Sequence, residues 1–335
     1  MLRTQTLDSA AAECPPLCSA GDLRRAVLQA RADAPRLASA GLDRILRWDA
    51  ARALIEVQSG TRWRALAASL ARSAPALEAC VARGALPGRV GDALAANAPA
   101  PDGQPLVALV EAATLVTPDG ELQCVSRARN ADLFALAVGG QGLFGLTYSI
   151  SLRVEALAQA ARHAQPAETL ELQRPGECAA RAIVLFVPPA QLEAFLAAAR
   201  ALCDQWRVPI ARIDVLRTRA EAETVLRWAK QGYAAVTLHL ALPQPLGACV
   251  RGTQLCRALI DCAIGHAGSF PIATTRDASR AQLEACYPEL KAVLVEKARR
   301  DPGARLSNAW YRHHRRVLED ARIVVRWNAP QAASA

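Results

Sequence analysis

Four of the chain's 19 glycines fall within seven residues, at Gly139, Gly140, Gly142 and Gly145. The segment Leu133–Glu155 reads LFALAVGGQGLFGLTYSISLRVE, which predicts a short helix, a glycine turn and a strand. A Rossmann fingerprint needs the opposite order, strand then glycines then helix, so a Rossmann site is not expected. Glycine does allow a backbone to lie against a flat or anionic ligand with its amides free to donate. A tight turn packed on a neighbouring helix is the alternative.

At 335 residues the chain exceeds what one hydrophobic core usually supports, so we expect two domains, or one large α/β unit. No apolar run is long enough for a membrane span or a secretory signal, which predicts a soluble cytoplasmic protein. The 10 cysteines form no CxxC pair and are expected to be free thiols, without a metal site.

The net charge of +9 comes largely from arginines that are spread along the chain, apart from YRHHRR at Tyr311–Arg316. This distribution is typical of a solvated surface, so we expect no nucleic-acid partner. The same charge favours an anionic small molecule.

Hydrophobic periodicity predicts helices at 19–35, 61–84, 189–206, 219–232, 252–268 and 280–300, the last ended by Asp301 and Pro302. Alternation predicts a strand pair within 44–60, a hairpin within 109–126, and strands at 180–188, 211–218 and 233–242. The polar, proline-bearing stretch 156–177 is the candidate boundary. We therefore expect an α+β protein with domains at 1–155 and 156–285, the second ferredoxin-like, and a C-terminal segment at 286–335.

Two stretches, read in order, carry a resemblance: LPGRVGDALAANAPAPDG and LVEAATLVTPDGELQCVSRARNADLFALAVGGQGLFGLTYSISLRV. Together they resemble the second half of the FAD-binding domain of the vanillyl-alcohol oxidase and p-cresol methylhydroxylase (PCMH) superfamily. Further along, DVLRTRAEAETVLRWAKQGYAAVTLHL and YPELKAVLVEKARRDPGARLSNAWY resemble the cap domain and C-terminal segment of FAD-linked oxidases of sugar alcohols, lactones and decaprenylphosphoryl ribose. The most specific part of the resemblance is 86–154.

The resemblance implies a PCMH-type FAD-binding domain, a substrate-binding cap, and non-covalently bound FAD that takes a hydride from an alcohol carbon of a small or sugar-like substrate. It implies two walls of the flavin site, which consist of Pro87, Gly91, Ala93 and Asn97 in the first, and Gly139, Gly140, Gly142, Gly145 and Thr147 in the second.

The chain departs from the family pattern at four places. The glycine-rich phosphate loop is missing or reduced to Ser39, Ala40 and Gly41, and Asp92 stands where a second glycine is usual. NAPAP replaces Asn-x-His-Gly, so no histidine is available for covalent flavin attachment, and HAGSFPIATT replaces a Tyr-Leu-Pro-Tyr run. The sequence therefore predicts a divergent FAD-dependent oxidoreductase. The missing phosphate loop favours the alternative function: a degenerate, non-catalytic flavin-fold protein that acts as a partner or binding module, for example beside a full-length paralogue.

The remaining candidates are histidines and basic residues. His266 is the candidate catalytic base, because it follows a helix beside the presumed substrate segment. His239 is expected in a core strand, and His313 and His314 in a solvated tail. Lys297 and Arg300 lie either on a solvated helix face or against an anionic substrate or the flavin.

Overall fold

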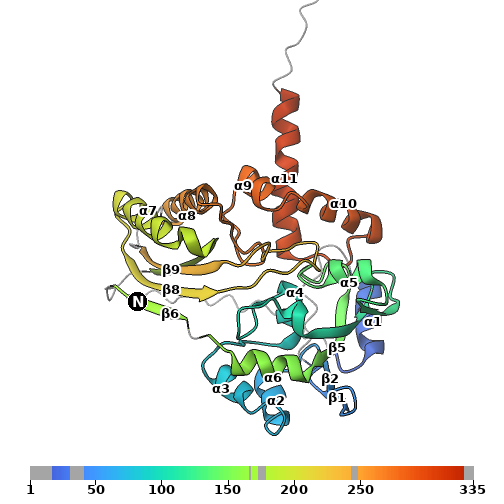
Figure 1. Cartoon of the computed structure of the whole chain (residues 1–335). Helices are drawn as coiled ribbons and strands as arrows, with labels where there is room; N and C mark the ends of the chain where they lie inside the picture. Colours follow the sequence, from blue (N-terminus) through green and yellow to red (C-terminus); the bar gives the residue numbers. More distant parts are fainter. Residues whose placement is uncertain (1–16, 31–40, 166, 173–178, 243–247, 328–335) are drawn as a thin grey trace, which may run out of the picture.

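The computed structural model describes residues 17–30, 41–165, 167–172, 179–242 and 248–327. It is an α+β structure with two antiparallel sheets, as expected (Figure 1). Within these ranges, no helix has the combination of length and apolar character that crossing a membrane requires.

The first sheet has the strand order β1-β2-β5-β3-β4, and every neighbouring pair is antiparallel. Its strands are β1 (Ile45–Asp49), β2 (Leu54–Gln58), β3 (Val110–Val116), β4 (Leu122–Ser126) and β5 (Leu146–Arg153). The helices of this unit are α1 (Ala20–Gln29), α2 (Trp63–Ser69), α3 (Ala76–Ala82), α4 (Val90–Ala96), η1 (Leu106–Leu109), α5 (Ala131–Ala137) and α6 (Val154–Arg162). Side chains from α2, α3, α4 and α6 share one core with the sheet, whereas α1 packs in a smaller cluster with Leu42, Val116 and Leu306.

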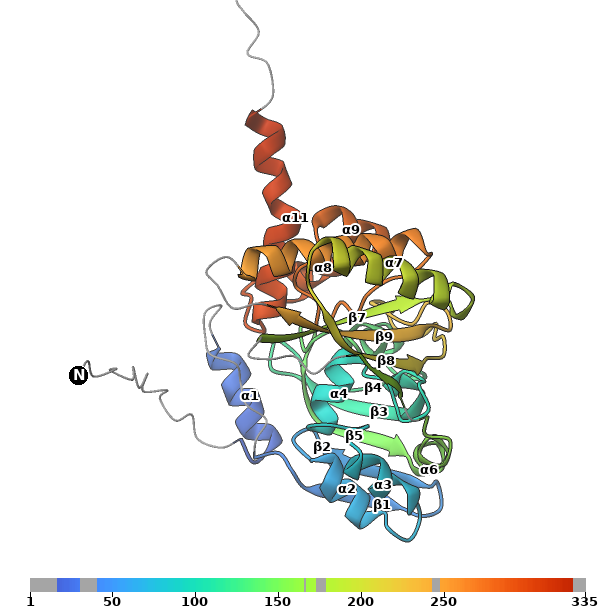
Figure 2. The ribbon, with the colours of Figure 1, turned by 90° about the vertical axis from the view of Figure 1, so that its left-hand side faces the viewer.

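The second sheet has the order β6-β8-β9-β7. Its strands are β6 (Glu168–Glu171), β7 (Ala179–Val187), β8 (Ile210–Arg217) and β9 (Ala234–Leu242). Its face away from the first unit is covered by α7 (Leu192–Gln205) and α8 (Ala248–Gly265); the short η2 (Pro189–Gln191) leads into α7 (Figure 2). The chain then forms α9 (Arg280–Cys286), α10 (Leu290–Arg300) and α11 (Ala309–Trp327), whose far end extends away from the body (Figure 1).

The first helix, both predicted strand pairs and the helix, glycine turn and strand of 133–155 are found where the pattern predicts them. The Ser19 side chain caps α1 with a capping box, which explains why the sequence predicts the start of this helix correctly. The predicted helix of 61–84 is two helices, α2 and α3, separated near Pro75. Helix α6 runs across the predicted boundary at 155–156 and packs against α3, so the chain passes to the second sheet only after Arg162.

The prediction of a helix at 219–232 is wrong. Glu221 accepts hydrogen bonds from the backbone N–H groups of Glu223 and Thr224, and the Val225 N–H donates to Ala135 O in the first unit. Because side-chain and long-range partners satisfy this backbone, the segment stays irregular despite its helical pattern.

The C-terminal prediction also needs correction. The expected single helix breaks at Tyr287 into α9 and α10, before Pro288. The expected solvated tail is the start of α11, where Trp310, Tyr311 and His314 are buried. The Asn308 side chain accepts from the Tyr311 N–H, which caps the helix start.

Candidate functional site

The two stretches that the sequence predicts as flavin walls lie directly against each other. The Gly139 N–H donates to Leu94 O at 3.0 Å, and the Gln141 N–H donates to Ala95 O at 2.9 Å. Leu94 and Ala95 lie in the last turn of α4, where carbonyls lack the usual helical partner, although Leu94 O also accepts from the N–H of Asn97 at 3.1 Å. The glycine turn therefore caps the C-terminal end of α4 with its own amides.

Packing within the protein explains why two of these positions are occupied by glycine. A Cβ on Gly140 would lie 1.9 Å from Leu136 O, and a Cβ on Gly145 would lie 3.0 Å from Leu115 Cβ. Gly139 and Gly142 have φ of +77° and +73°, a region that other residues rarely adopt. Gly142 differs in that the nearest atom to its Cβ position, Leu146 Cδ2, is 4.0 Å away.

Asn97 is the centre of the first wall. It is fully buried in a left-handed conformation just after α4, and its Oδ1 accepts from the Val107 N–H at 2.9 Å. Its carbonyl accepts from Trp228 Nε1 at 2.8 Å, and the Trp228 indole stacks on Phe186 with ring centroids 5.2 Å apart. The irregular segment that carries Trp228 and Glu221 thus covers Asn97 with the protein's own side chains.

The other predicted wall residues are more dispersed. Gly91 packs on Ser59, where a Cβ would lie 2.6 Å from the Ser59 carbonyl oxygen. Ala93 is buried in α4, Pro87 is exposed before it, and Thr147 lies half-buried on β5 opposite Leu115. The structure therefore brings Ala93, Asn97, Gly139 and Gly140 into one cluster and leaves Pro87 outside it. Of the predicted phosphate-loop remnant, Ser39 and Ala40 lie outside the described residues.

His266 lies apart from this cluster. It follows α8, its Nδ1 lies 2.8 Å from Cys262 O, and its ring packs edge-on against Phe195 of α7. Helices α7 and α8 cover the outer face of the second sheet (Figures 1 and 2), and the contact with Phe195 places the His266 ring against this layer.

A polar cluster that the sequence did not indicate crosses three strands of the second sheet. His239 Nε2 lies 2.7 Å from Asp214 Oδ2, and Thr169 Oγ1 donates to Asp214 Oδ1 at 2.8 Å. Arg212 also approaches both residues, at 3.0 Å each. Although burial alone would raise it, these hydrogen bonds hold the pKa of Asp214 below its usual value. His239 is thus a half-exposed partner of a carboxylate rather than a core residue.

Lys297 is fully buried and pairs with Asp301, which also accepts from the N–H groups of Arg305 and Leu306. The expectation of a solvated face is wrong for this residue, because the pair holds the turn after α10 together. Burial lowers the pKa of Lys297, and the hydrogen bond to Asp301 opposes that effect. Arg300 binds Glu296 on the same helix at 2.5 Å.

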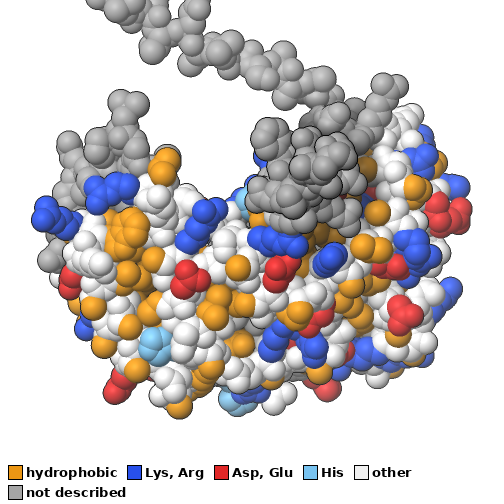
Figure 3. Space-filling view, turned by 90° about the horizontal axis from the view of Figure 1, so that it is seen from above, with side chains coloured by type: hydrophobic (Ala, Val, Ile, Leu, Met, Phe, Trp, Pro, Cys, Tyr) orange, Lys and Arg blue, Asp and Glu red, His pale blue; other side chains and the backbone are white. Residues whose placement is uncertain are grey.

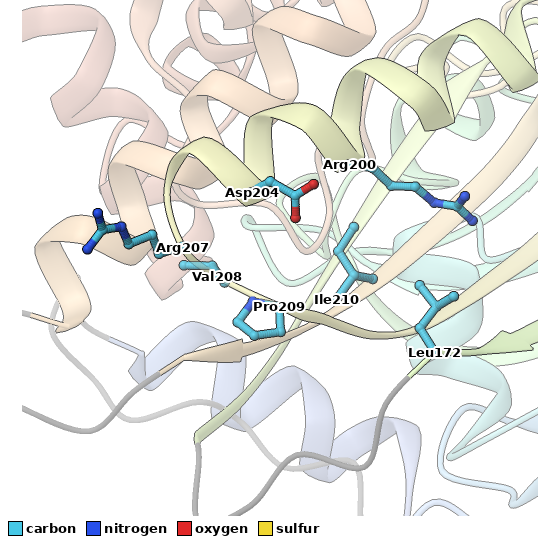
Figure 4. A pocket seen from close by; sticks show the side chains of 7 residues that line it. All are labelled: Leu172, Arg200, Asp204, Arg207, Val208, Pro209 and Ile210. Atoms are coloured by element: carbon cyan, nitrogen blue, oxygen red, sulfur yellow. The ribbon is translucent and has the colours of Figure 1, made fainter.

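Three of the hollows on the surface of the described chain bear on the search for a site. One of about 580 Å³ lies between the end of α7 and β8, lined by Leu172, Arg200, Asp204, Arg207, Val208, Pro209 and Ile210. Figure 4 shows Arg200 and Arg207 pointing in opposite directions from it, so they do not converge on one anion. The other two, of about 430 and 470 Å³, lie beside β1.

On the face in Figure 3, basic side chains are spread among apolar and acidic ones. No group of three or more His, Cys, Asp and Glu side chains with metal-binding geometry occurs in the described part of the chain. Neither a scan against models of protein families nor a search of curated proteins finds a match to this chain.

Proposed function

We propose that this chain has the architecture of an FAD-linked oxidase and works as a non-catalytic binding module. In this proposal 1–155 derives from the PCMH-type FAD-binding domain, 156–285 from the cap and 286–335 from the C-terminal segment. The order β7-α7-β8-β9-α8, with β9 between β8 and β7, supports a ferredoxin-like cap. An isolated antiparallel β-bridge joins Phe186 to Ser269, at the position of the fourth strand of the ferredoxin-like fold.

The observation that carries the proposal is the hydrogen bonding of the glycine turn. A pyrophosphate or flavin is held by backbone N–H groups that are free to donate. Here the N–H groups of Gly139, Gly140 and Gln141 donate to Leu94 O, Ala137 O and Ala95 O. A ligand that used these amides would have to uncap α4 and lose the hydrogen bonds already made.

The second candidate function is that of an FAD-dependent oxidoreductase acting on an alcohol carbon of a small or sugar-like substrate. Gly142 favours it, because open space at its Cβ position leaves room for a ligand beside the turn. In this candidate His266 remains the candidate catalytic base.

Flavin titration separates the two candidates. We expect the purified protein to be colourless and to leave FAD fluorescence unchanged when FAD is added in excess. A band near about 450 nm that remains with the protein through gel filtration would overturn the proposal and favour the oxidoreductase. Gly142→Val then serves as the matched variant: loss of the band with an unchanged melting temperature would place the flavin beside the turn.

A separate measurement tests whether this chain acts as a binding module. We expect the chain to form a complex with a flavin-containing, full-length paralogue when the two are co-expressed, seen as one species by light scattering. Separate elution of the two proteins at all concentrations, without flavin on this chain, would contradict that partner.

A further inference from the structure

The two sheets have four edges, and three of them are protected. At the edge of β4, Asn130 Nδ2 donates to Cys124 O at 2.9 Å and so occupies that carbonyl. At the edge of β7, the backbone N–H and C=O groups of Phe186 and Ser269 form two hydrogen bonds of 2.8 Å with each other. Strand β6 is exposed but carries two glutamates, Glu168 and Glu171, which discourage strand addition.

Strand β1 is the unprotected edge. All of its residues except Asp49 are exposed, and among the described residues no strand other than β2 pairs with it. Three large apolar side chains gather on these five residues: Ile45 is 41% exposed, Leu46 39% and Trp48 45%. Edge strands of this kind recruit a further strand, because their outer N–H and C=O groups have no partner.

We propose that β1 binds β1 of a second copy of this chain, antiparallel and about a two-fold axis at Trp48. In this register Trp48 lies opposite the partner's Trp48, and Arg47 lies opposite the partner's Asp49. The two-fold axis repeats the second contact, so both ion pairs form at once. The inference goes beyond the proposed function and does not depend on it.

Charge complementarity favours a second copy of this chain as the binding partner of β1. β1 carries one cation and one anion two residues apart, and Arg47 Nη2 already lies 3.1 Å from Asp49 Oδ2 within the strand. Because the dimer exchanges two intramolecular pairs for two intermolecular pairs, the net gain is small, so the charges set the register and the apolar side chains supply the affinity. β6 offers only like charges to a copy of itself.

The surroundings of β1 fit a short, weak contact. The hollow of about 470 Å³ beside Trp48 is lined in part by Ala53, Val154 and Ala158, which leaves apolar surface next to the two-fold axis. A register shift between Ile45 and Arg47 restricts regular pairing to the end of the strand. We therefore expect a dimer that dissociates on dilution.

Two single variants and their mixture test the register. By sedimentation equilibrium, we expect the wild-type chain to dimerise with increasing concentration. Arg47→Asp places two carboxylates opposite each other, and Asp49→Arg places two guanidinium groups opposite each other, so each should weaken the dimer about tenfold or more. Mixed in equal amounts, the two variants should form a heterodimer at least as tight as the wild type, and the double exchange Arg47→Asp with Asp49→Arg should restore the homodimer.

The control is Leu170→Glu on β6, which is 47% exposed in the wild type and should leave dimerisation unchanged. Circular dichroism confirms that each variant is folded. A wild-type chain that stays monomeric at all concentrations overturns the proposal, as does a dimer that the β1 variants do not affect. Loss of the dimer in both single variants without recovery in their mixture overturns the antiparallel register.

Discussion

The glycine turn is held to α4 by backbone hydrogen bonds between uncharged groups, whereas the C-terminal part of the chain contains a buried ion pair and a buried histidine. The turn pairs the amides of Gly139 and Gln141 with Leu94 O and Ala95 O, and Gly140 between them has no room for a Cβ. In the C-terminal part, Trp310 Nε1 donates to Ile272 O at 2.8 Å, and Lys297 pairs with Asp301. The first region is therefore sensitive to side-chain volume, and the second to charge and protonation.

The largest effect is expected from Gly140→Val. Its Cβ alone would lie 1.9 Å from Leu136 O, so the turn must move and α4 loses its cap. We expect destabilisation by more than about 4 kcal/mol and loss of cooperative thermal unfolding, followed by circular dichroism. Gly265→Ala is the control, because nothing lies within 4 Å of that Cβ position. A Gly140→Val protein that melts like the wild type would mean that the turn is not a packing element.

A smaller effect is expected in the second region from Lys297→Met. Removing the ammonium group leaves the Asp301 carboxylate buried without its cation, which typically costs about 3–5 kcal/mol. Urea unfolding at pH 7 measures this loss. Arg299→Met, on the exposed side of the same helix, should leave the unfolding midpoint nearly unchanged. Equal midpoints for the two variants would contradict the distinction between buried and exposed pairs.

The smallest effect concerns protonation of His314. Burial lowers its pKa from the ordinary 6.5 to about 4, and its Nε2 has no hydrogen-bond partner among the described residues. The unfolded chain binds this proton below pH 6.5 while the folded chain does not, so stability present above pH 6.5 is lost as the pH falls towards 4. The loss is about 3 kcal/mol between pH 7 and pH 4.

Urea unfolding across this pH range measures the effect, with His314→Leu as the comparison. The variant should lose less stability than the wild type on acidification, since both share every other titrating group. Identical pH profiles for the two proteins would show that His314 is protonated in the folded state or reached by solvent.

Local signals made much of this fold predictable. The capping box at Ser19 and the Pro118-Asp119-Gly120 turn act within a few residues, and the elements that they delimit are α1 and the β3–β4 hairpin. The segment with Trp228 was not predictable, because its partners Ala135 and Asn97 come from another part of the chain. The two predicted wall stretches indicate that Asn97 and Gly139 lie close together. The cap on α4 depends on how these two stretches are oriented relative to each other, and the sequence pattern does not contain that information.

The contacts of 305–308 with the first unit bear on the order in which the nascent chain acquires structure. Asn308 Nδ2 donates to Gln141 O at 2.8 Å across 167 residues, and Arg305 Nη1 donates to Pro118 O across 187 residues. At 5–20 residues per second, a ribosome needs about 10–30 s to go from Gln141 to Asn308. Throughout that interval the glycine turn and the β3–β4 hairpin lack their last partners. The N-terminal unit thus gains these contacts only after the whole second sheet has been synthesised.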